Sequence, residues 1–247
     1  PAAKGKAIVN LLQLTTEERV AATVAVRDFA DDRYLVFATE QGTIKKTPLS
    51  EYGNPRAGGI IAINIEEGDR LLAVRVTEGG TDILLATADG FSIRFPESEA
   101  RPLSRATYGV RGITLRKGDH VVGMEALAKE GAILTVSERA YGKRTPVDEY
   151  RVQGRGGLGV INLKVTGKTG KVIGARQVVP GDQLLLITQE GMLIRTAVDG
   201  IREIGRSTQG VKLQDLDAAD KLVAMAKVLE REEEKDEDGD EGQETLN

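Results

Sequence analysis

The fold of this chain is decided by the stretch Ile83-Leu84-Leu85-Ala86-Thr87-Ala88-Asp89-Gly90-Phe91-Ser92-Ile93-Arg94-Phe95. Its two apolar runs are rich in residues that favour a pleated strand. Asp89-Gly90 lies between them, and a glycine accepts the positive φ that a tight hairpin turn needs. The stretch therefore predicts a β-hairpin whose second strand carries a basic residue, Arg94.

The same pattern occurs four times along the chain. The copies begin at Leu35, Ile83, Ile133 and Leu184. A basic residue recurs in the second run at intervals of 48, 50 and 51 residues, as Lys46, Arg94, Arg144 and Arg195. The third copy has Ala140 where the others have glycine, so we expect a longer connection there, through Tyr141-Gly142. A period of roughly 50 residues is typical of a propeller-like array.

A second element, a glycine followed by alternating apolar residues, lies between the hairpins. Its five copies begin at Gly5, Gly59, Gly112, Gly159 and Gly210. A third run with strand character follows each copy, at 20–26, 71–76, 121–124, 172–176 and 222–228. Because helical periodicity is absent, the pattern predicts an all-β array with three or four strands per unit, whose blades bury their faces against each other.

The composition excludes several kinds of site. The chain has 247 residues and no cysteine, which excludes disulfides, Cys-ligated metals and thiol nucleophiles and fits a reducing cytoplasm. His120 is the single histidine and has no second histidine or cysteine with which to complete a metal site. Residues 154–159 satisfy G-x-G-x-x-G, but the residues that follow alternate like a strand, so we reject a dinucleotide site. There is no P-loop and no apolar run long enough to cross a membrane, and we expect no cofactor in this chain.

The net charge of -4 hides an uneven distribution. Residues 230–247 hold ten acidic and two basic residues, a net of -8, so residues 1–229 carry about +4. The acidic run has no aromatic residue, and we expect it to be disordered. It either provides solubility or competes with an anionic ligand for a basic surface.

Basic residues also recur in the loops between each hairpin and the next glycine element. Because blades are arranged radially, equivalent positions predict a stripe around the edge that matches phosphates along a bent DNA duplex. The alternative is ordinary solvated charge that protects strand edges. Arg101 and Arg202 lie in these loops. The candidate DNA-binding residues are Lys45, Lys46, Arg56, Arg94, Arg105, Arg111, Lys143, Arg144, Arg151, Arg155, Arg195 and Arg206.

Several stretches resemble the C-terminal DNA-wrapping domain family of DNA gyrase A, over essentially the whole chain. They are Ile8-Val9-Asn10-Leu11-Leu12, Gly109-Val110-Arg111-Gly112-Ile113, Tyr141-Gly142-Lys143-Arg144-Thr145 and Gly205-Arg206-Ser207-Thr208-Gln209-Gly210-Val211. The resemblance implies a β-pinwheel, here of about five to six four-stranded blades with a strand swap between blades. It also implies a cytoplasmic, nucleoid-associated domain, monomeric when isolated, that wraps duplex DNA with positive handedness.

The resemblance assigns the chemistry to other parts of the enzyme. The catalytic tyrosine, Mg²⁺ and ATP would belong to the rest of the gyrase A polypeptide and to gyrase B, in an A2B2 assembly. This chain would be non-catalytic on its own. It would present a wrapped transfer segment for ATP-dependent negative supercoiling.

The family's box motif, Q-[KR]-R-G-G-[KR]-G, is degenerate in this chain. Its counterpart is the turn Gln153-Gly154-Arg155-Gly156-Gly157-Leu158-Gly159, in which Gly154 and Leu158 replace basic residues. Five glycine elements instead of six, with the start at Pro1, imply an incomplete first blade. We therefore expect residues 1–229 to form the pinwheel domain and residues 230–247 to form the tail.

Three other functions stay open at this point. The first is the corresponding C-terminal domain of topoisomerase IV, which is also a pinwheel. Its box motifs are more degraded, and it does not wrap DNA strongly. A propeller scaffold for protein partners would show negligible DNA affinity at low salt. A propeller enzyme would carry clustered carboxylates or histidines at loop ends, which the sequence does not show.

Overall fold

Four β-hairpins form where the repeat predicts them. This is seen in a computed structural model that describes residues 14–15, 18–56, 58–217 and 219–228. The hairpins are β1 (Tyr34–Thr39) with β2 (Thr43–Pro48), β4 (Asp82–Thr87) with β5 (Phe91–Pro96), β8 (Ala132–Ser137) with β9 (Tyr141–Pro146), and β12 (Gln183–Thr188) with β13 (Leu193–Ala197). A short 3-10 helix follows each hairpin, at η2 (Leu49–Tyr52), η3 (Glu97–Glu99), η4 (Val147–Glu149) and η5 (Val198–Gly200).

The turn of the third hairpin corrects one expectation. Ala140 has φ of 57°, so this alanine adopts the left-handed conformation that glycine takes in the other turns, for example 82° at Gly90. The connection is as tight as that of the second hairpin, and the longer loop predicted at Tyr141-Gly142 was wrong. Backbone hydrogen bonds from Ala140 N–H to the Ser137 carbonyl (3.0 Å) and from Leu213 N–H to the Ala140 carbonyl (2.7 Å) hold the strained residue in place.

Each blade gains a third strand from its own module, and the first three blades gain a fourth from the module that follows. The third strands are β3 (Leu71–Thr77), β7 (Val121–Leu127), β11 (Val172–Val178) and β15 (Leu222–Val228), and each pairs with the first hairpin strand. The fourth strands are β6 (Val110–Arg111) on β2, β10 (Val160–Ile161) on β5, and β14 (Val211–Lys212) on β9. The strand swap implied by the resemblance is therefore present.

The described residues form four blades, three of four strands and one of three, so the expectation of five to six blades was wrong. The elements at Gly159 and Gly210 lead directly into the swapped strands β10 and β14, and β6 ends just before the element at Gly112. These segments complete preceding blades instead of starting additional ones. The first glycine element, the N-terminal part of the expected first blade and the acidic tail lie outside the described residues.

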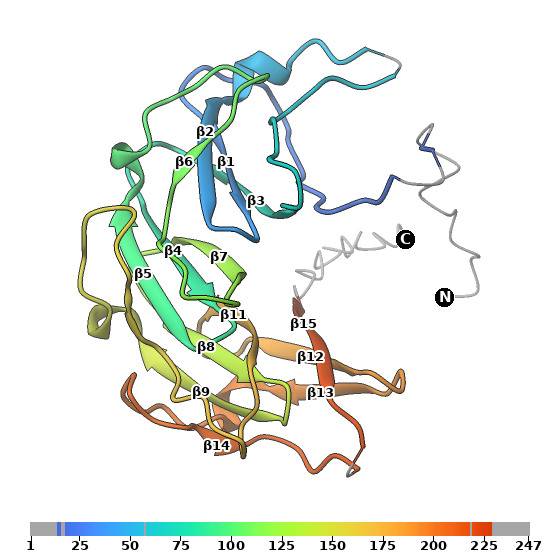
Figure 1. Cartoon of the computed structure of the whole chain (residues 1–247), viewed down its shortest axis with the longest axis vertical. Helices are drawn as coiled ribbons and strands as arrows, with labels where there is room; N and C mark the ends of the chain where they lie inside the picture. The colour runs from blue at the N-terminus through green and yellow to red at the C-terminus, as the bar shows by residue number, and fades with distance from the viewer. Residues whose placement is uncertain (1–13, 16–17, 57, 218, 229–247) are drawn as a thin grey trace, which may run out of the picture.

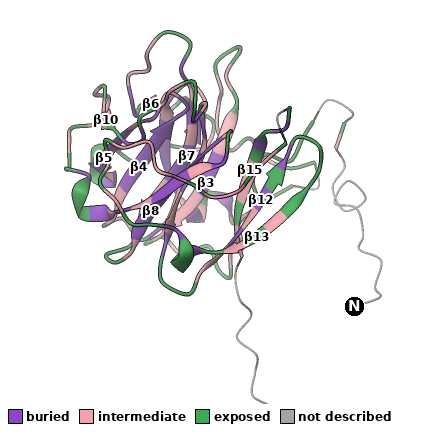
Figure 2. Ribbon diagram, turned by 90° about the horizontal axis from the view of Figure 1, so that it is seen from below, coloured by how far each residue is buried: buried purple, intermediate pink, exposed green. Residues whose placement is uncertain are grey.

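The four sheets follow one another around an arc, with β3, β7, β11 and β15 toward its middle (Figure 1). Successive inner strands contact each other, β3 with β7, β7 with β11, and β11 with β15. Apolar side chains between neighbouring blades form the core; one cluster joins Val36 and Ile44 of the first blade to Leu85 and Met124 of the second. Figure 2 shows burial concentrated along the central strands and exposure in the connections. No helix among the described residues is long and apolar enough to cross a membrane.

Candidate nucleic-acid interface

Three equivalent loops lie on the outer edge of the arc, and we call them the rim loops. They span residues 101–109, 151–159 and 202–210, and each runs from a 3-10 helix to the strand that is swapped onto the preceding blade. Each is fastened near its start to the hairpin of that blade, by backbone bonds from Leu103 to Lys46 (2.8 Å), Gln153 to Arg94 (2.8 Å) and Ile204 to Arg144 (2.9 Å). Figure 1 shows loop 101–109, which leads to β6, and the yellow loop 151–159 on the outside of the arc. Because a rim loop projects from every swap, side chains at equivalent positions recur along this edge.

Each rim loop begins with an exposed arginine. Arg101, Arg151 and Arg202 are spaced by 50 and 51 residues, the same intervals as the hairpins that carry them. Within the described part of the chain, none of their guanidinium groups has an ion pair or hydrogen bond. These three charges are therefore available to an anionic ligand, and of the three only Arg151 was among the sequence-predicted site residues.

A second set of rim arginines joins each loop to a segment of the preceding module, which is a swapped strand for the second and third loops. Nη1 of Arg105 donates to the Ile61 carbonyl at 2.8 Å, that of Arg155 to the Arg111 carbonyl at 2.5 Å, and that of Arg206 to the Ile161 carbonyl at 3.1 Å. These predicted DNA-binding residues are half-buried. Their guanidinium groups are partly used in holding each rim loop against the preceding module.

The basic residues at the repeat positions of the hairpins connect blades instead of facing outward. Lys46 is buried and its Nζ lies 2.7 Å from Glu97 Oε1 of the next module. Arg94 pairs with Asp82 at 2.8 Å and donates to the Val147 and Tyr150 carbonyls. Arg144 donates to the Ile201 carbonyl at 2.7 Å. The prediction of a continuous outer stripe from these positions needs correction, because the following module covers them.

The fourth position of that set differs from the other three. Arg195 is exposed, and its Nε donates to Gln183 Oε1. Its strand β13 has no swapped partner strand among the described residues. Arg56 and Arg111 are also exposed, as contacts to phosphates require.

Lys45 and Lys143 are fully buried, which removes them from the surface that DNA could reach. Lys45 Nζ donates to the Ala62 carbonyl at 2.9 Å and to the Arg105 carbonyl. Lys143 Nζ donates to the Gly205 carbonyl at 2.6 Å and to the Arg206 carbonyl. Desolvation lowers the pKa of Lys45 to about 8 and that of Lys143 to about 7. The prediction that these two lysines contact DNA was therefore wrong, because they bond backbone carbonyls inside the fold.

The box-like turn, residues 153–159, forms most of the middle rim loop. Gly156 and Gly159 have φ of 84° and 71°, a region that side chains other than glycine rarely adopt. A Cβ on Gly159 would lie 2.5 Å from the Ser92 carbonyl oxygen, so this glycine lets the loop cross the edge of β5. Leu158 is 54% exposed at the tip. The turn thus places backbone, Arg155 and an apolar side chain on the rim.

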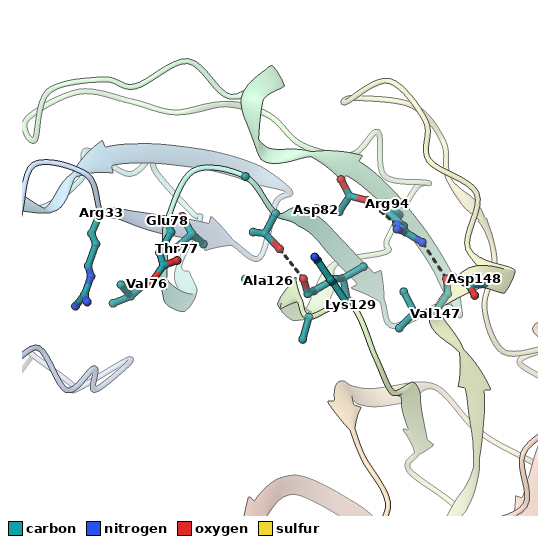
Figure 3. Close-up of a pocket in the computed structure, with 14 residues that line it drawn as sticks. Arg33, Val76, Thr77, Glu78, Asp82, Arg94, Ala126, Lys129, Val147 and Asp148 are labelled. Carbon is teal, nitrogen blue, oxygen red and sulfur yellow. Dashed lines mark hydrogen bonds and ion pairs between the residues drawn. The ribbon is translucent and has the colours of Figure 1, made fainter.

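A cavity with walls of mixed charge lies elsewhere (Figure 3). Its volume is about 870 Å³, and its wall includes Arg33, Glu78, Lys129 and Asp148. The Arg94 guanidinium at its side is already bonded to Asp82 and to backbone carbonyls. The described residues contain no group of three or more His, Cys, Asp or Glu side chains able to hold a metal ion.

Comparison with known proteins agrees with this architecture. The sequence model of the family described as DNA gyrase C-terminal domain, beta-propeller, matches residues 33–78, 81–128, 132–178 and 182–228, one match per blade. The chain belongs to this DNA gyrase C-terminal domain family. In this gyrase domain each matched segment contains one hairpin and its inner strand, while the rim loops and swapped strands tie one segment to the next.

The relatives place the gyrase domain within longer proteins. The DNA gyrase A protein of Salmonella typhimurium is 44% identical over 228 residues, which cover 92% of this chain and 26% of that protein. The DNA gyrase A protein of Streptomyces coelicolor is 42% identical, with 96% and 29% covered. This chain therefore spans about a quarter of the length of the curated relatives it matches.

Two solved structures share the fold. The C-terminal domain of DNA topoisomerase IV superposes with a TM-score of 0.85 at 25% identity, covering 91% of this chain and 70% of that one. A DNA gyrase A C-terminal domain gives 0.82 at 26% identity, covering 92% and 76%. The gyrase family thus sets the identity of the domain, while the fold is common to both enzymes.

Proposed function

We propose that this gyrase C-terminal domain binds duplex DNA without sequence preference and wraps it chirally around the rim loops. The observation that carries the proposal is the recurrence of Arg101, Arg151 and Arg202, exposed and unpaired among the described residues, at equivalent points of three successive modules. Contacts from such points to phosphates give affinity through counterion release and need no readout of bases. An arc of equivalent contacts also imposes a bend on the duplex.

The rim must offset the cost of bending DNA. Smooth bending of a 20 to 30 bp site costs on the order of 1 to 6 kcal/mol. Arg105, Arg155 and Arg206 fasten the rim loops to backbone carbonyls of the preceding module. The loops are therefore held in place before DNA arrives, so little ordering of the protein is needed on binding.

In the complete enzyme, the proposed role is mechanical. The domain would act in the bacterial cytoplasm, on the nucleoid, as a non-catalytic part of a gyrase A2B2 assembly. Wrapped DNA would be presented as the transfer segment for ATP-dependent negative supercoiling. Mg²⁺, ATP and the catalytic tyrosine would be supplied by the rest of gyrase A and by gyrase B.

A triple variant tests the rim arginines. We expect Arg101→Ala/Arg151→Ala/Arg202→Ala to weaken duplex binding and to reduce the slope of log K against log salt by about 3, since each phosphate contact contributes about 0.9. The matched control is Arg70→Ala/Lys171→Ala/Lys221→Ala, which removes the same charge from residues already paired with Glu40, Asp89 and Glu138. Equal losses in the two triple variants, measured by filter binding from 50 to 200 mM salt, would reject the rim as the binding surface.

The structural similarity to topoisomerase IV supports a second candidate, a domain that binds DNA without strong wrapping. Relaxed plasmid incubated with the domain and then closed by ligase separates the two. A handed change in linking number is expected for wrapping. Binding with no such change would favour the topoisomerase IV type of function.

A further inference from the structure

Two of the three rim loops rest on a buried ammonium group. Lys45 and Lys143 occupy equivalent positions in β2 and β9, and neither side chain is exposed. Each donates to the backbone carbonyl of a rim arginine, Lys45 to that of Arg105 and Lys143 to that of Arg206. No ion pair to either ammonium occurs within the described ranges. The charges that act on the pKa of each lysine are those of Glu51 and Arg105 for Lys45, and of Arg206 and Glu149 for Lys143.

This contact fixes the orientation of one peptide group in each loop. The described chain has no cis peptide bond, and in a trans peptide the C=O and the following N–H point in opposite directions. Since the Arg105 and Arg206 carbonyls point inward to the lysines, the N–H groups of Ala106 and Ser207 point outward. Both residues are exposed, and neither N–H has a hydrogen-bond partner among the described residues.

The middle rim loop provides an internal comparison. Its hairpin has Ile93 at the position of the two lysines, and this side chain is buried and apolar. Here the N–H of Gly156, the counterpart of Ala106 and Ser207, donates inward to the Gly112 carbonyl at 2.8 Å. In the first loop the equivalent carbonyl, that of Ala62, is bonded by Lys45 instead. Lys45 therefore replaces a backbone donor and leaves the Ala106 N–H free to face outward. Lys143 bonds the Gly205 and Arg206 carbonyls of its own loop instead.

We propose that the Ala106 and Ser207 N–H groups are binding sites for phosphodiester oxygens, and that Lys45 and Lys143 are positioning residues that orient them. This rests on the proposed function for the identity of the ligand. An anionic oxygen forms strong hydrogen bonds with backbone N–H groups. Arg101 and Arg202 begin the same two loops, and the exposed Ser207 hydroxyl adds a second donor without an intramolecular partner among the described residues. The middle loop lacks this backbone site and relies on Arg151.

Either protonation state of the lysines supports the arrangement. Each amine bonds two carbonyls, and a neutral amine still carries two N–H groups. The orientation of the two peptides therefore persists when pH rises above the lowered pKa values of about 8 and about 7.

Amide resonances of the unmodified chain test the site directly. Titration with inorganic phosphate, and separately with a duplex of about 25 bp, is followed by ¹H–¹⁵N correlation spectra. We expect the Ala106 and Ser207 amides to move downfield with both ligands and the Gly156 amide to stay in place. Unmoved Ala106 and Ser207 amides, or an equal shift at Gly156, would overturn the proposal. If phosphate shifts the two amides while no duplex binds at low salt, the anion site stands and the proposed DNA function fails.

A pair of double variants tests the positioning role. Lys45→Met/Lys143→Met removes the donors to the two carbonyls, and we expect duplex affinity to fall about tenfold with the salt slope nearly unchanged, because a backbone contact rather than a surface charge is lost. The control Lys117→Met/Lys168→Met removes the same charge from exposed positions. Retained phosphate shifts at Ala106 and Ser207 in the first variant would show that the lysines do not orient these peptides. If that variant does not fold, the titration of the unmodified chain still decides the site.

Discussion

The ammonium of Lys46 lies 2.7 Å from Glu97 Oε1, and both side chains are almost fully buried between the first two blades. The same carboxylate oxygen accepts a hydrogen bond from the Thr77 hydroxyl at 3.1 Å, and the Tyr34 ring lies 4.2 Å from Lys46 Nζ. A module is thus joined to the next by a charge pair that water does not reach.

We predict that Lys46→Met destabilises the fold by about 3 to 5 kcal/mol, because Glu97 is left buried without its partner. Lys46→Met/Glu97→Met should recover much of that loss, because the double variant leaves no unpaired charge buried. Urea unfolding measures both. Arg70→Met, which breaks the exposed pair with Glu40, is the control and should change the free energy of unfolding by less than about 1 kcal/mol. A double variant no more stable than Lys46→Met would contradict the explanation.

The stability of the fold should rise with pH above neutrality because of Lys143. Burial lowers the pKa of Lys143 from 10.5 to about 7, with the charge of Arg206 adding to the effect. Between these two values the unfolded chain binds a proton that the native chain does not, so the free energy of unfolding increases with pH. Below about pH 7 the native state carries the full cost of a buried charge.

Lys143→Ile, which copies the residue at position 93, isolates this effect. We expect the unmodified chain to gain on the order of a few kcal/mol relative to the variant between pH 7 and pH 10. Parallel stability curves for the two proteins over that range would show that Lys143 is charged in the fold at neutral pH. Chemical denaturation at several pH values supplies the curves.

Glycine at the second hairpin turn is required for close approach as well as for conformation. A Cβ on Gly90 would lie 2.1 Å from the Leu163 carbonyl oxygen, at a residue with φ of 82°. Gly68 has φ of 78° but open space around it. We predict that Gly90→Ala costs more than about 3 kcal/mol and Gly68→Ala about 1 kcal/mol, the latter from the left-handed conformation alone. Thermal unfolding with equal losses at both positions would rule out the steric contribution.

Removing residues 230–247 should strengthen DNA binding, because this segment carries a net charge of -8 next to a body of about +4. The expected change is largest at low salt. A matched variant that keeps the length and replaces the ten acidic residues with Gln and Asn separates charge from bulk. Equal affinity for all three proteins would leave the tail without an inhibitory role.

The hairpins, their period and their glycine turns were predictable from the sequence because they are local. An apolar run, a residue able to take positive φ and a second apolar run specify a hairpin without reference to the rest of the chain. The exposed arginine that begins each rim loop, such as Arg151, could also be predicted from the sequence, because it follows the hairpin at a fixed spacing. One signal in the sequence was missed: Ile93 stands at the position of Lys45 and Lys143, and an apolar residue at an equivalent position marks it as interior.

Only the tertiary structure decided which blade each segment completes and which charged side chains remain exposed to solvent. The glycine elements look alike in sequence, yet those at Gly159 and Gly210 lead into strands that cross to the preceding blade, whereas the one at Gly112 follows such a strand. That crossing covers the outer edge of β2, β5 and β9, so Lys45 and Lys46 become interior while Arg101 stays exposed. The sequence of one strand shows which side chains alternate between its two faces. Burial at its edge depends on a partner strand that lies 66 to 71 residues later in the chain.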